Sequence, residues 1–264
     1  MQRKYIGMQH DIIKSIKKLK KGDKCHPYRF IIEGHWDHEK VMDSRVNIES
    51  LIVCIDLIKT PFEDSIYRKC LAQANDIYYV SEKVIRKLCD KDKASGLISI
   101  CTLPHFKIDT EMSNITKLIV LDGLETPGNI GTIFRSCDGS GIDAVIIVNE
   151  RAKINSYKTI KASMGGSFTI PWYFFDSAIA CQEWLVSNGY TLVLADPHSQ
   201  HSFKRVNYGN KSALVVGNER YGLSKDWNLE NSLKVSIPML GKCDSLNVGV
   251  AASIILYEMC IKET

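Results

Sequence analysis

The chain has 264 residues, of which 45% are apolar, and it carries a formal net charge of +4 at pH 7. This length allows one large domain or two smaller ones with substantial cores. No apolar run approaches the roughly 20 residues of a membrane-spanning helix, and no apolar segment follows the N-terminal charges, so neither a membrane span nor a secretory signal is expected.

The cysteines point to a reducing compartment. Their number, nine, is odd, and no Cys-x-x-Cys pair occurs among them. This usage favours free thiols in a cytoplasmic protein over a disulfide framework or a structural zinc site.

The positive charge is concentrated near the N-terminus. Residues 1–30 contain nine Lys or Arg and two Asp, a net charge of +7, which leaves −3 for the remaining residues. In residues 9–21, apolar residues recur at helical spacing with lysines opposite, which predicts an amphipathic helix with a cationic surface. Such a segment favours a polyanionic partner, most simply a nucleic acid, although a helix that only promotes solubility fits this feature equally well.

Strands and helices alternate over the first 105 residues. The pattern predicts strands at 29–34, 51–55, 77–80 and 97–101, and helices at 36–42 and 82–90. This alternation describes a compact α/β unit. The polar, irregular stretch 102–117 is expected to be a linker, so that one domain covers residues 1–105 and a second covers residues 113–264.

A second alternation fills the rest of the chain. Apolar strands are expected at 118–122, 144–148, 190–195, 213–217 and 233–237, and helical segments at 129–139, 157–164, 177–187 and 245–262. Continuous apolar strands separated by helices predict a parallel sheet that is covered on both faces.

The stretch from Ile237 to Met259 predicts a loop followed by a helix. Asp244 or Ser245 is expected to cap this helix, because a side-chain oxygen at that position can accept from the free N–H groups of the first turn. The helix is apolar on nearly every side, so we expect it to be buried on two sides. Ser245 and Asn247 in its first turn have two explanations, a polar cap or a bound polar ligand.

Common catalytic motifs are missing from the sequence. It contains no G-x-G-x-x-G, P-loop, G-x-S-x-G or H-E-x-x-H. Two His-x-x-His pairs, His35 with His38 and His198 with His201, could hold a metal, but neither has a further ligand at suitable spacing. We therefore expect no metal site, and we expect these histidines to be polar surface residues.

Three motifs accompany strands of the predicted parallel sheet, and their loops should meet at its carboxyl edge, where such sheets bind ligands. They are PGNIGTIFRS at 127–136, VGNERYGLS at 216–224 and IPMLGKCDSLNVGVAAS at 237–253. In this order and spacing they resemble the signature motifs of the SpoU (TrmH-type) RNA ribose 2′-O-methyltransferases of the SPOUT superfamily, over residues 118–262. RFIIEG, VSEKVIRKL and GLISI resemble, more weakly, the N-terminal substrate-binding domain of the rRNA-modifying members. Gly249 and Asp138 depart from the family pattern.

The resemblance implies an α/β protein whose C-terminal parallel-sheet domain contains a deep trefoil knot. It also implies a small ribosomal-protein-like α/β domain at residues 1–105 that binds RNA, and a homodimer whose two chains share a site. The implied activity is transfer of a methyl group from S-adenosyl-L-methionine to a ribose 2′-hydroxyl, most simply in ribosomal RNA. The alternatives are a tRNA ribose methyltransferase and a non-catalytic RNA-binding protein that retains the fold. Antibiotic-resistance rRNA methyltransferases share the same two-domain layout.

The resemblance also implies roles for single residues. Arg135 would activate the 2′-hydroxyl, and because a guanidinium does not ordinarily lose its proton, a bidentate grip on the adjacent phosphate is its physically easier role. Asn129 would bind the ribose, and Glu219 would orient Arg135 or a neighbouring loop. The structural alternatives are an Arg–Glu surface pair and an Asn in a turn. The implied cofactor contacts are Leu194, Gly217, Asn218, Ile237, Met239, Ser245, Leu246 and Asn247.

Overall fold

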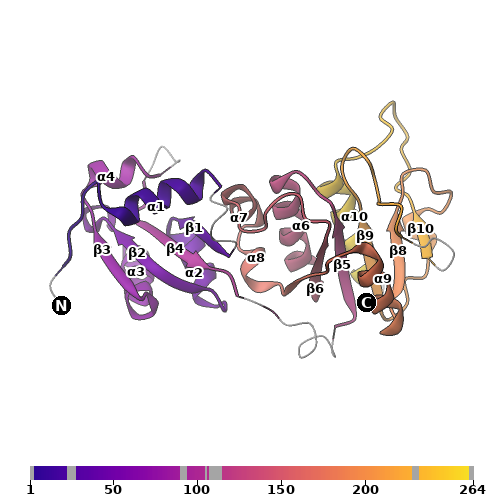
Figure 1. Ribbon diagram of the computed structural model, residues 1–264, viewed down its shortest axis with the longest axis horizontal. Coiled ribbons are helices and arrows are strands. Elements are labelled where there is room, and N and C mark those ends of the chain that lie inside the picture. Colours follow the sequence, from indigo (N-terminus) through magenta and orange to yellow (C-terminus); the bar gives the residue numbers. More distant parts are fainter. Residues whose placement is uncertain are drawn as a thin grey trace. The chain divides into compact units, whose positions relative to one another are not determined.

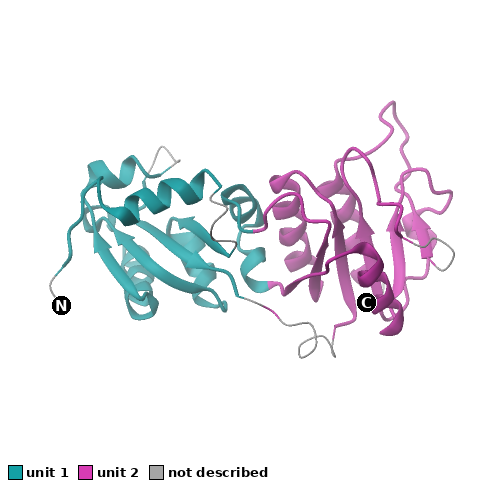
Figure 2. Cartoon of the chain, in the orientation of Figure 1, with its two compact units in different colours: residues 1–105, 155–169 teal, residues 106–154, 170–264 magenta. Residues whose placement is uncertain are grey.

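The computed structural model describes residues 3–22, 28–89, 94–104, 106, 115–227 and 232–261. The chain forms two compact units (Figure 2). Unit 1 comprises residues 1–105 and 155–169, and unit 2 comprises residues 106–154 and 170–264. Most of the linker expected at 102–117 lies outside the described residues. Among the helices that the structure describes, none has both the length and the apolar character needed to span a bilayer.

Unit 1 is built on a four-stranded sheet in the order β1-β4-β2-β3 (Figure 1). Its strands are β1 (Arg29–Glu33), β2 (Asn47–Val53), β3 (Asp76–Tyr79) and β4 (Leu97–Thr102). β4 runs antiparallel to β1 and β2, whereas β3 runs parallel to β2. Its helices are α1 (Asp11–Lys20), α2 (His35–Met42), η1 (Ile55–Leu57), α3 (Pro61–Gln73), α4 (Glu82–Arg86), α7 (Tyr157–Ser163) and α8 (Gly166–Thr169).

Helices cover both faces of this sheet. Ile52 and Ile98 belong to one buried cluster with residues of α1 and α4. Ser99, the next residue along β4, points the other way, and its hydroxyl contacts His38 of α2. Because successive strand residues face opposite sides, α1 and α4 lie on one face, and α2 lies on the other with α3, which it contacts.

The expectation that His35 and His38 lie at the surface is wrong. His38 is fully buried and His35 is only 6% exposed, because the face of α2 that carries both residues packs against the sheet. The Nδ1 of His38 lies 2.7 Å from the carbonyl oxygen of Gly34, and its Nε2 lies 2.8 Å from the Oγ of Ser99. A neutral ring satisfies both contacts by donating to the carbonyl and accepting from the hydroxyl. Burial lowers the pKa of His38 to about 4.

We expect unit 1 to lose stability as the pH falls from about 6.5 to about 4. Over this window the unfolded chain binds a proton at His38 that the folded chain does not, so the free energy of unfolding decreases, by roughly 3 kcal/mol at its lower end. Urea midpoints measured across the window should fall steeply for the wild type and less steeply for His38→Gln, which has no titrating ring. Equal slopes for the two proteins would contradict this assignment.

Unit 2 contains a six-stranded sheet in the order β10-β8-β9-β5-β6-β7 (Figure 1). Every neighbouring pair in it is parallel. The strands are β5 (Lys117–Asp122), β6 (Ala144–Val148), β7 (Trp172–Phe174), β8 (Thr191–Ala195), β9 (Ser212–Val216) and β10 (Ser232–Val235). The helices are α6 (Pro127–Ser140), α9 (Ala178–Ser187), η2 (Phe203–Arg205) and α10 (Val248–Ile261). The expectation of an α/β protein with a parallel-sheet domain and an N-terminal domain is confirmed.

The last helix, α10, begins later than predicted. Asn247 caps it, because its Oδ1 accepts from the N–H groups of Gly249 at 2.9 Å and Val250 at 3.3 Å. The hydroxyl of Ser245 instead donates to Asp244. The expectation that Asp244 or Ser245 caps the helix is therefore wrong, since an equally good capping residue follows them.

Burial of α10 on two sides is not found in the single chain. The helix packs against α6, where the Oγ atoms of Ser136 and Ser253 lie 2.6 Å apart. On its free side, Val250 and Ile261 are exposed, whereas the hydroxyl of Tyr257 lies against Gly139 of α6. The all-round apolar pattern therefore leaves one apolar face of α10 uncovered.

Candidate active site

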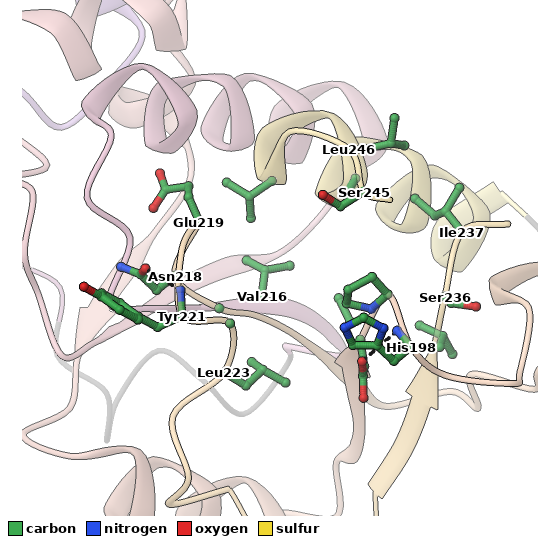
Figure 3. A pocket seen from close by; sticks show the side chains of 18 of the residues that line it. His198, Val216, Asn218, Glu219, Tyr221, Leu223, Ser236, Ile237, Ser245 and Leu246 are labelled. Atoms are coloured by element: carbon green, nitrogen blue, oxygen red, sulfur yellow. Dashed lines mark hydrogen bonds between the residues drawn. The ribbon is translucent and has the colours of Figure 1, made fainter. Parts of the chain in front are cut away.

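A cavity of about 740 Å³ lies in unit 2 at the carboxyl ends of β8, β9 and β10 (Figure 3). Its walls come from residues 195–198, from the loop after β9, and from the segment between β10 and the start of α10. The volume falls within the range typical of small-molecule sites, and the position at the carboxyl edge of a parallel sheet is where such folds bind ligands.

Most of the expected cofactor-binding residues line this cavity. They are Gly217, Asn218, Ile237, Met239, Ser245, Leu246 and Asn247. Leu194 is buried within β8, and the next residue, Ala195, lines the cavity instead. The cavity is also lined by Asp196 and His198, which none of the three motifs singled out. Their position directly after a predicted strand of the same sheet is the signal that points to them.

The loop after β9 is held in a tight turn. Asn218 and Gly222 exchange two backbone hydrogen bonds of 2.9 Å, and the side-chain oxygen of Asn218 accepts from the N–H groups of Arg220 and Tyr221. Gly217 lies so close to the far side of the turn that a Cβ atom there would overlap the backbone of Gly222. Only glycine fits at this position, because any side chain would force the turn open.

Glu219 ties this loop to the loop after β5. Its carboxylate accepts from the N–H groups of Glu125 at 3.0 Å and Thr126 at 3.1 Å, and from the Nδ2 of Asn129 at 2.8 Å. Partial burial pushes the pKa of Glu219 upward, but these hydrogen bonds outweigh it and the pKa is lowered. Glu219 is therefore an ionised acceptor that fixes the start of α6.

Asn129 and Asn247 extend this connection to the third motif. The Nδ2 of Asn247 donates to the Oδ1 of Asn129 at 3.0 Å, while the Oδ1 of Asn247 caps α10. Glu219, Asn129 and Asn247 thus form one hydrogen-bonded chain across the three sequence motifs, and they are 90 and 118 residues apart. A second link joins the loops after β9 and β5, because the Nδ2 of Asn218 donates to the carbonyl oxygen of Gly123 at 2.7 Å.

Comparisons with known proteins identify the family. The model of the SpoU rRNA methylase family matches residues 116–257, more than half of the chain. The chain belongs to the SpoU rRNA methylase family. The resemblance inferred from the three motifs is therefore confirmed, and the chain is an RNA methyltransferase by family. A second model, of the MRM3-like substrate-binding domain, matches residues 10–99 of this methylase.

Individual relatives cover the SpoU methylase to different extents. The 23S rRNA (guanosine(2553)-2′-O)-methyltransferase RlmP of Bacillus subtilis is 26% identical over 94% of this chain and 95% of its own. The AdoMet-bound structure of an rRNA methyltransferase from Sinorhizobium meliloti is 25% identical, covers 100% of both chains and has a TM-score of 0.87. The TrmH/SpoU tRNA-modifying enzyme of A. aeolicus, 27% identical with a TM-score of 0.51, covers only 56% of this chain and 76% of its own.

Arg135 of the methylase is exposed on α6 and is available to bind an anion. Within the described part of the chain it has no hydrogen-bond or ion-pair partner. It therefore does not form the surface pair with Glu219 that was the structural alternative, because the carboxylate of Glu219 holds residues 125–129. Glu219 was expected to orient either Arg135 or a neighbouring loop. In the structure its carboxylate accepts hydrogen bonds from the loop after β5.

The cavity of the methylase suits a ligand that is partly apolar and partly polar. Val216, Leu223 and Ile237 surround it together with Leu246, which is itself partly exposed (Figure 3). Polar side chains in the wall include Asp196, Ser236 and Ser245. S-adenosylmethionine, with an apolar-faced adenine, a ribose and a charged amino-acid tail, fits this combination. The described residues include no group of three His, Cys, Asp or Glu side chains that could hold a metal ion.

Proposed function

We propose that this SpoU methylase transfers a methyl group from S-adenosyl-L-methionine to a ribose 2′-hydroxyl of ribosomal RNA. The expected enzyme class, reaction and methyl donor are confirmed at the level of the family and of the RlmP and Sinorhizobium relatives. The observation that carries the proposal for this chain is the hydrogen-bonded chain from Glu219 through Asn129 to Asn247, because it joins all three motifs beside one cavity.

Ribosomal RNA is favoured over tRNA by the extent of the similarities. RlmP and the Sinorhizobium rRNA methyltransferase cover nearly all of this chain, including unit 1, whereas the tRNA-modifying enzyme covers little more than half. The match of residues 10–99 to a substrate-binding domain supports the same assignment. Because the proposed substrate is ribosomal RNA, we also propose that the enzyme acts in the cytoplasm.

The donor would be held by the loops after β8, β9 and β10. Gly217 allows close approach of the backbone, while Ile237, Met239 and Leu246 offer apolar contact and Ser245 and Asn247 offer polar contact. Ala195 takes the place at the cavity wall that the resemblance gives to Leu194. When bound, S-adenosylmethionine supplies a methyl group on a positively charged sulfur, which is already activated for transfer.

Arg135 would grip the phosphate beside the target ribose through two parallel hydrogen bonds. In that position its charge also favours the developing 2′-oxyanion. Asn129 is buried and bonded at both ends of its amide, so we propose that it positions the loops. Glu219 already accepts three hydrogen bonds and its pKa is lowered, which makes it a poor base. The hydroxyl proton would therefore pass to a phosphate oxygen or to water.

The proposal includes the trefoil knot and the homodimer. Support for the knot comes from the resemblance and from the course of the chain after β10, which passes the cavity before entering α10 beside α6. Support for the dimer comes from the free face of α10, where Val250 is 45% and Ile261 is 57% exposed. Burying such a face against a second copy removes apolar surface from water.

We expect the double variant Val250→Glu/Ile261→Glu to be a monomer, because two carboxylates cannot be buried in an apolar interface without partners. Analytical ultracentrifugation measures the change directly. The matched control, Ile179→Glu/Val186→Glu, alters two exposed apolar residues of α9 and should remain a dimer. A dimer that survives the α10 change and dissociates with the α9 change would place the interface on α9.

The proposed activity is tested by nucleoside mass spectrometry of ribosomal RNA from cells with and without this gene. Loss of one 2′-O-methylated nucleotide from ribosomal RNA in the deletion strain, restored by the wild-type gene, is the expected result. Loss of a tRNA ribose methylation instead would favour the tRNA alternative. An unchanged methylation profile in both RNA classes would contradict the proposal.

A further inference from the structure

The N-terminal arm of unit 1, residues 3–10, is held against the edge of the sheet. The N–H of Tyr79 donates to the carbonyl of Lys4 at 2.8 Å, and the N–H of Ile6 donates to the carbonyl of Tyr79 at 2.9 Å. β3 is the last strand in the order β1-β4-β2-β3, so the arm covers its free edge. From there the chain leads directly into α1.

Cations and aromatic rings gather along this arm. The Nζ of Lys4 lies 4.8 Å from the ring centre of Tyr78, and the ring centre of His10, at the start of α1, lies 5.3 Å from that same ring. Tyr78 thus joins the arm to α1. Tyr5 lies between these groups in the sequence, and its side chain is 63% exposed.

Helix α1, which follows the arm, carries exposed lysines. Positions 10, 14, 18 and 21 follow each other at intervals of three or four residues, so His10, Lys14, Lys18 and Lys21 share one face of the helix. Lys14 pairs with Asp11 at 2.8 Å. Lys18 and Lys21 are exposed and have no partner among the residues that the structure describes. We call Lys4, Tyr5, His10, Lys14, Lys18 and Lys21 the cationic row.

The fold compensates for the charge of the cationic row only in part. Like charges three or four residues apart destabilise a helix by about 0.2–0.5 kcal/mol per pair. The helix dipole compensates for lysines in the last turn, such as Lys18. Lys14 pairs with Asp11 and Lys4 lies over the ring of Tyr78, but all of these lysines remain exposed to solvent. An anionic partner removes the repulsion along the whole row.

The opposite face of α1 decides which kind of anion fits. Ile13, Ile16 and Leu19 are buried in the core of unit 1, against the sheet and α4. A helix that binds a membrane surface inserts its apolar face into the lipid, and α1 has none left to insert. The row is therefore suited to a soluble polyanion, and the exposed ring of Tyr5 suits one that carries bases.

We propose that the cationic row binds the phosphate backbone of the substrate RNA and that Tyr5 stacks on an unpaired base. The inference rests on the proposed function, and it assigns to unit 1 a specific RNA-gripping surface, formed by the arm and α1. Phosphate contacts give affinity and orientation without reading sequence, and stacking on an aromatic ring tolerates any base.

The test compares two double variants with equal loss of charge. Lys18→Gln/Lys21→Gln removes two members of the row, and Lys59→Gln/Lys69→Gln removes two exposed lysines from the α3 side of the same unit. Binding of a 23S ribosomal RNA transcript is measured at several salt concentrations. We expect the RNA affinity of the row variant to be about tenfold lower than that of the wild type at 0.15 M salt. The slope of log K against log salt should be less steep by about 1.4, because two phosphate contacts are lost. The control should match the wild type.

Methyl transfer to the same transcript separates this inference from the proposed function. The row variant should raise KM and leave kcat and binding of S-adenosylmethionine unchanged, because the row lies outside the catalytic unit. Tyr5→Ala should weaken RNA binding, and Tyr5→Phe should restore it, because the phenyl ring still stacks. Equal RNA affinities for the row variant and the control would overturn the inference while leaving the activity intact. A wild-type protein that neither binds nor methylates the transcript would overturn both.

Vesicles containing phosphatidylserine test the remaining class of anion. We expect no binding of the wild type to them at 0.15 M salt. Vesicle binding that is lost in the row variant, with RNA binding unchanged, would overturn the inference in favour of a membrane surface.

Discussion

The Arg135→Ala variant should bind S-adenosylmethionine as the wild type does and transfer its methyl group at least 100-fold more slowly. Removing one group that stabilises a developing oxyanion commonly lowers kcat by about 10²–10³-fold, and here the same change removes the grip on the phosphate. Fold and donor binding should survive, because Arg135 is exposed, has no partner among the described residues and does not line the cavity. Single-turnover transfer of a labelled methyl group to 23S ribosomal RNA measures the loss.

Two further arginine variants sharpen this result. Arg135→Lys should recover only part of the rate, since an ammonium group cannot form the two parallel hydrogen bonds of a guanidinium. Arg151→Ala removes another exposed arginine of unit 2, one that pairs with Glu125 at 2.6 Å, and should be close to wild type. An Arg135→Ala protein as active as Arg151→Ala would show that Arg135 is not the central catalytic residue.

The Gly217→Ala variant should lose at least 100-fold in affinity for S-adenosylmethionine. The added methyl group would overlap the backbone of Gly222, so the turn that forms one wall of the cavity has to open. Opening it also pulls Asn218 and Glu219 away from the partners that join the motifs. Isothermal titration calorimetry measures the affinity, and far-UV circular dichroism shows whether the variant remains folded.

Gly128→Ala is the matched control. A Cβ atom at Gly128 meets nothing within 4 Å, and the residue lies in the first turn of α6. The change should leave donor affinity unaltered and slightly raise stability, because alanine favours the helix more than glycine. Wild-type donor affinity in Gly217→Ala would contradict the placement of the donor beside this turn.

Most strands of the parallel sheet in unit 2 could be predicted, because they are continuous apolar runs. Residues 144–148 form a strand at the predicted positions, and other predicted strands differ by a few residues at their ends. α3 was not predicted, although Thr60 and Glu63 form a capping box at its start and Pro61 occupies its first turn. Its buried face consists of only a few residues, including Ile66 and Cys70, so its apolar periodicity is weak.

Contacts between distant segments could not be predicted from local pattern. Residues 155–169 lie within the predicted second domain, yet they pack with unit 1, where Asn155 donates to the carbonyl of Arg29 and Phe168 stacks on Phe30. Only a three-dimensional structure reveals such pairings, because nothing in either segment alone specifies its partner.

The same reason explains what was missed at the site. The three motifs predict which residues matter, and their strands predict one shared edge of the sheet. Glu219 was expected to orient Arg135 or a loop, and Asn129 to bind ribose, but the side chains could not be paired from the sequence. Their mutual hydrogen bond depends on the crossing of loops that are 90 residues apart.

The central claim is that three joined loops hold S-adenosylmethionine for transfer to a ribose hydroxyl. It is tested most directly by incubating the purified protein with methyl-labelled donor and a 23S ribosomal RNA transcript, then digesting the RNA to nucleosides for mass spectrometry. The account predicts label in a single 2′-O-methylated nucleoside, with transfer lost in Arg135→Ala. Label on a base, or an unlabelled transcript despite donor binding, would contradict it.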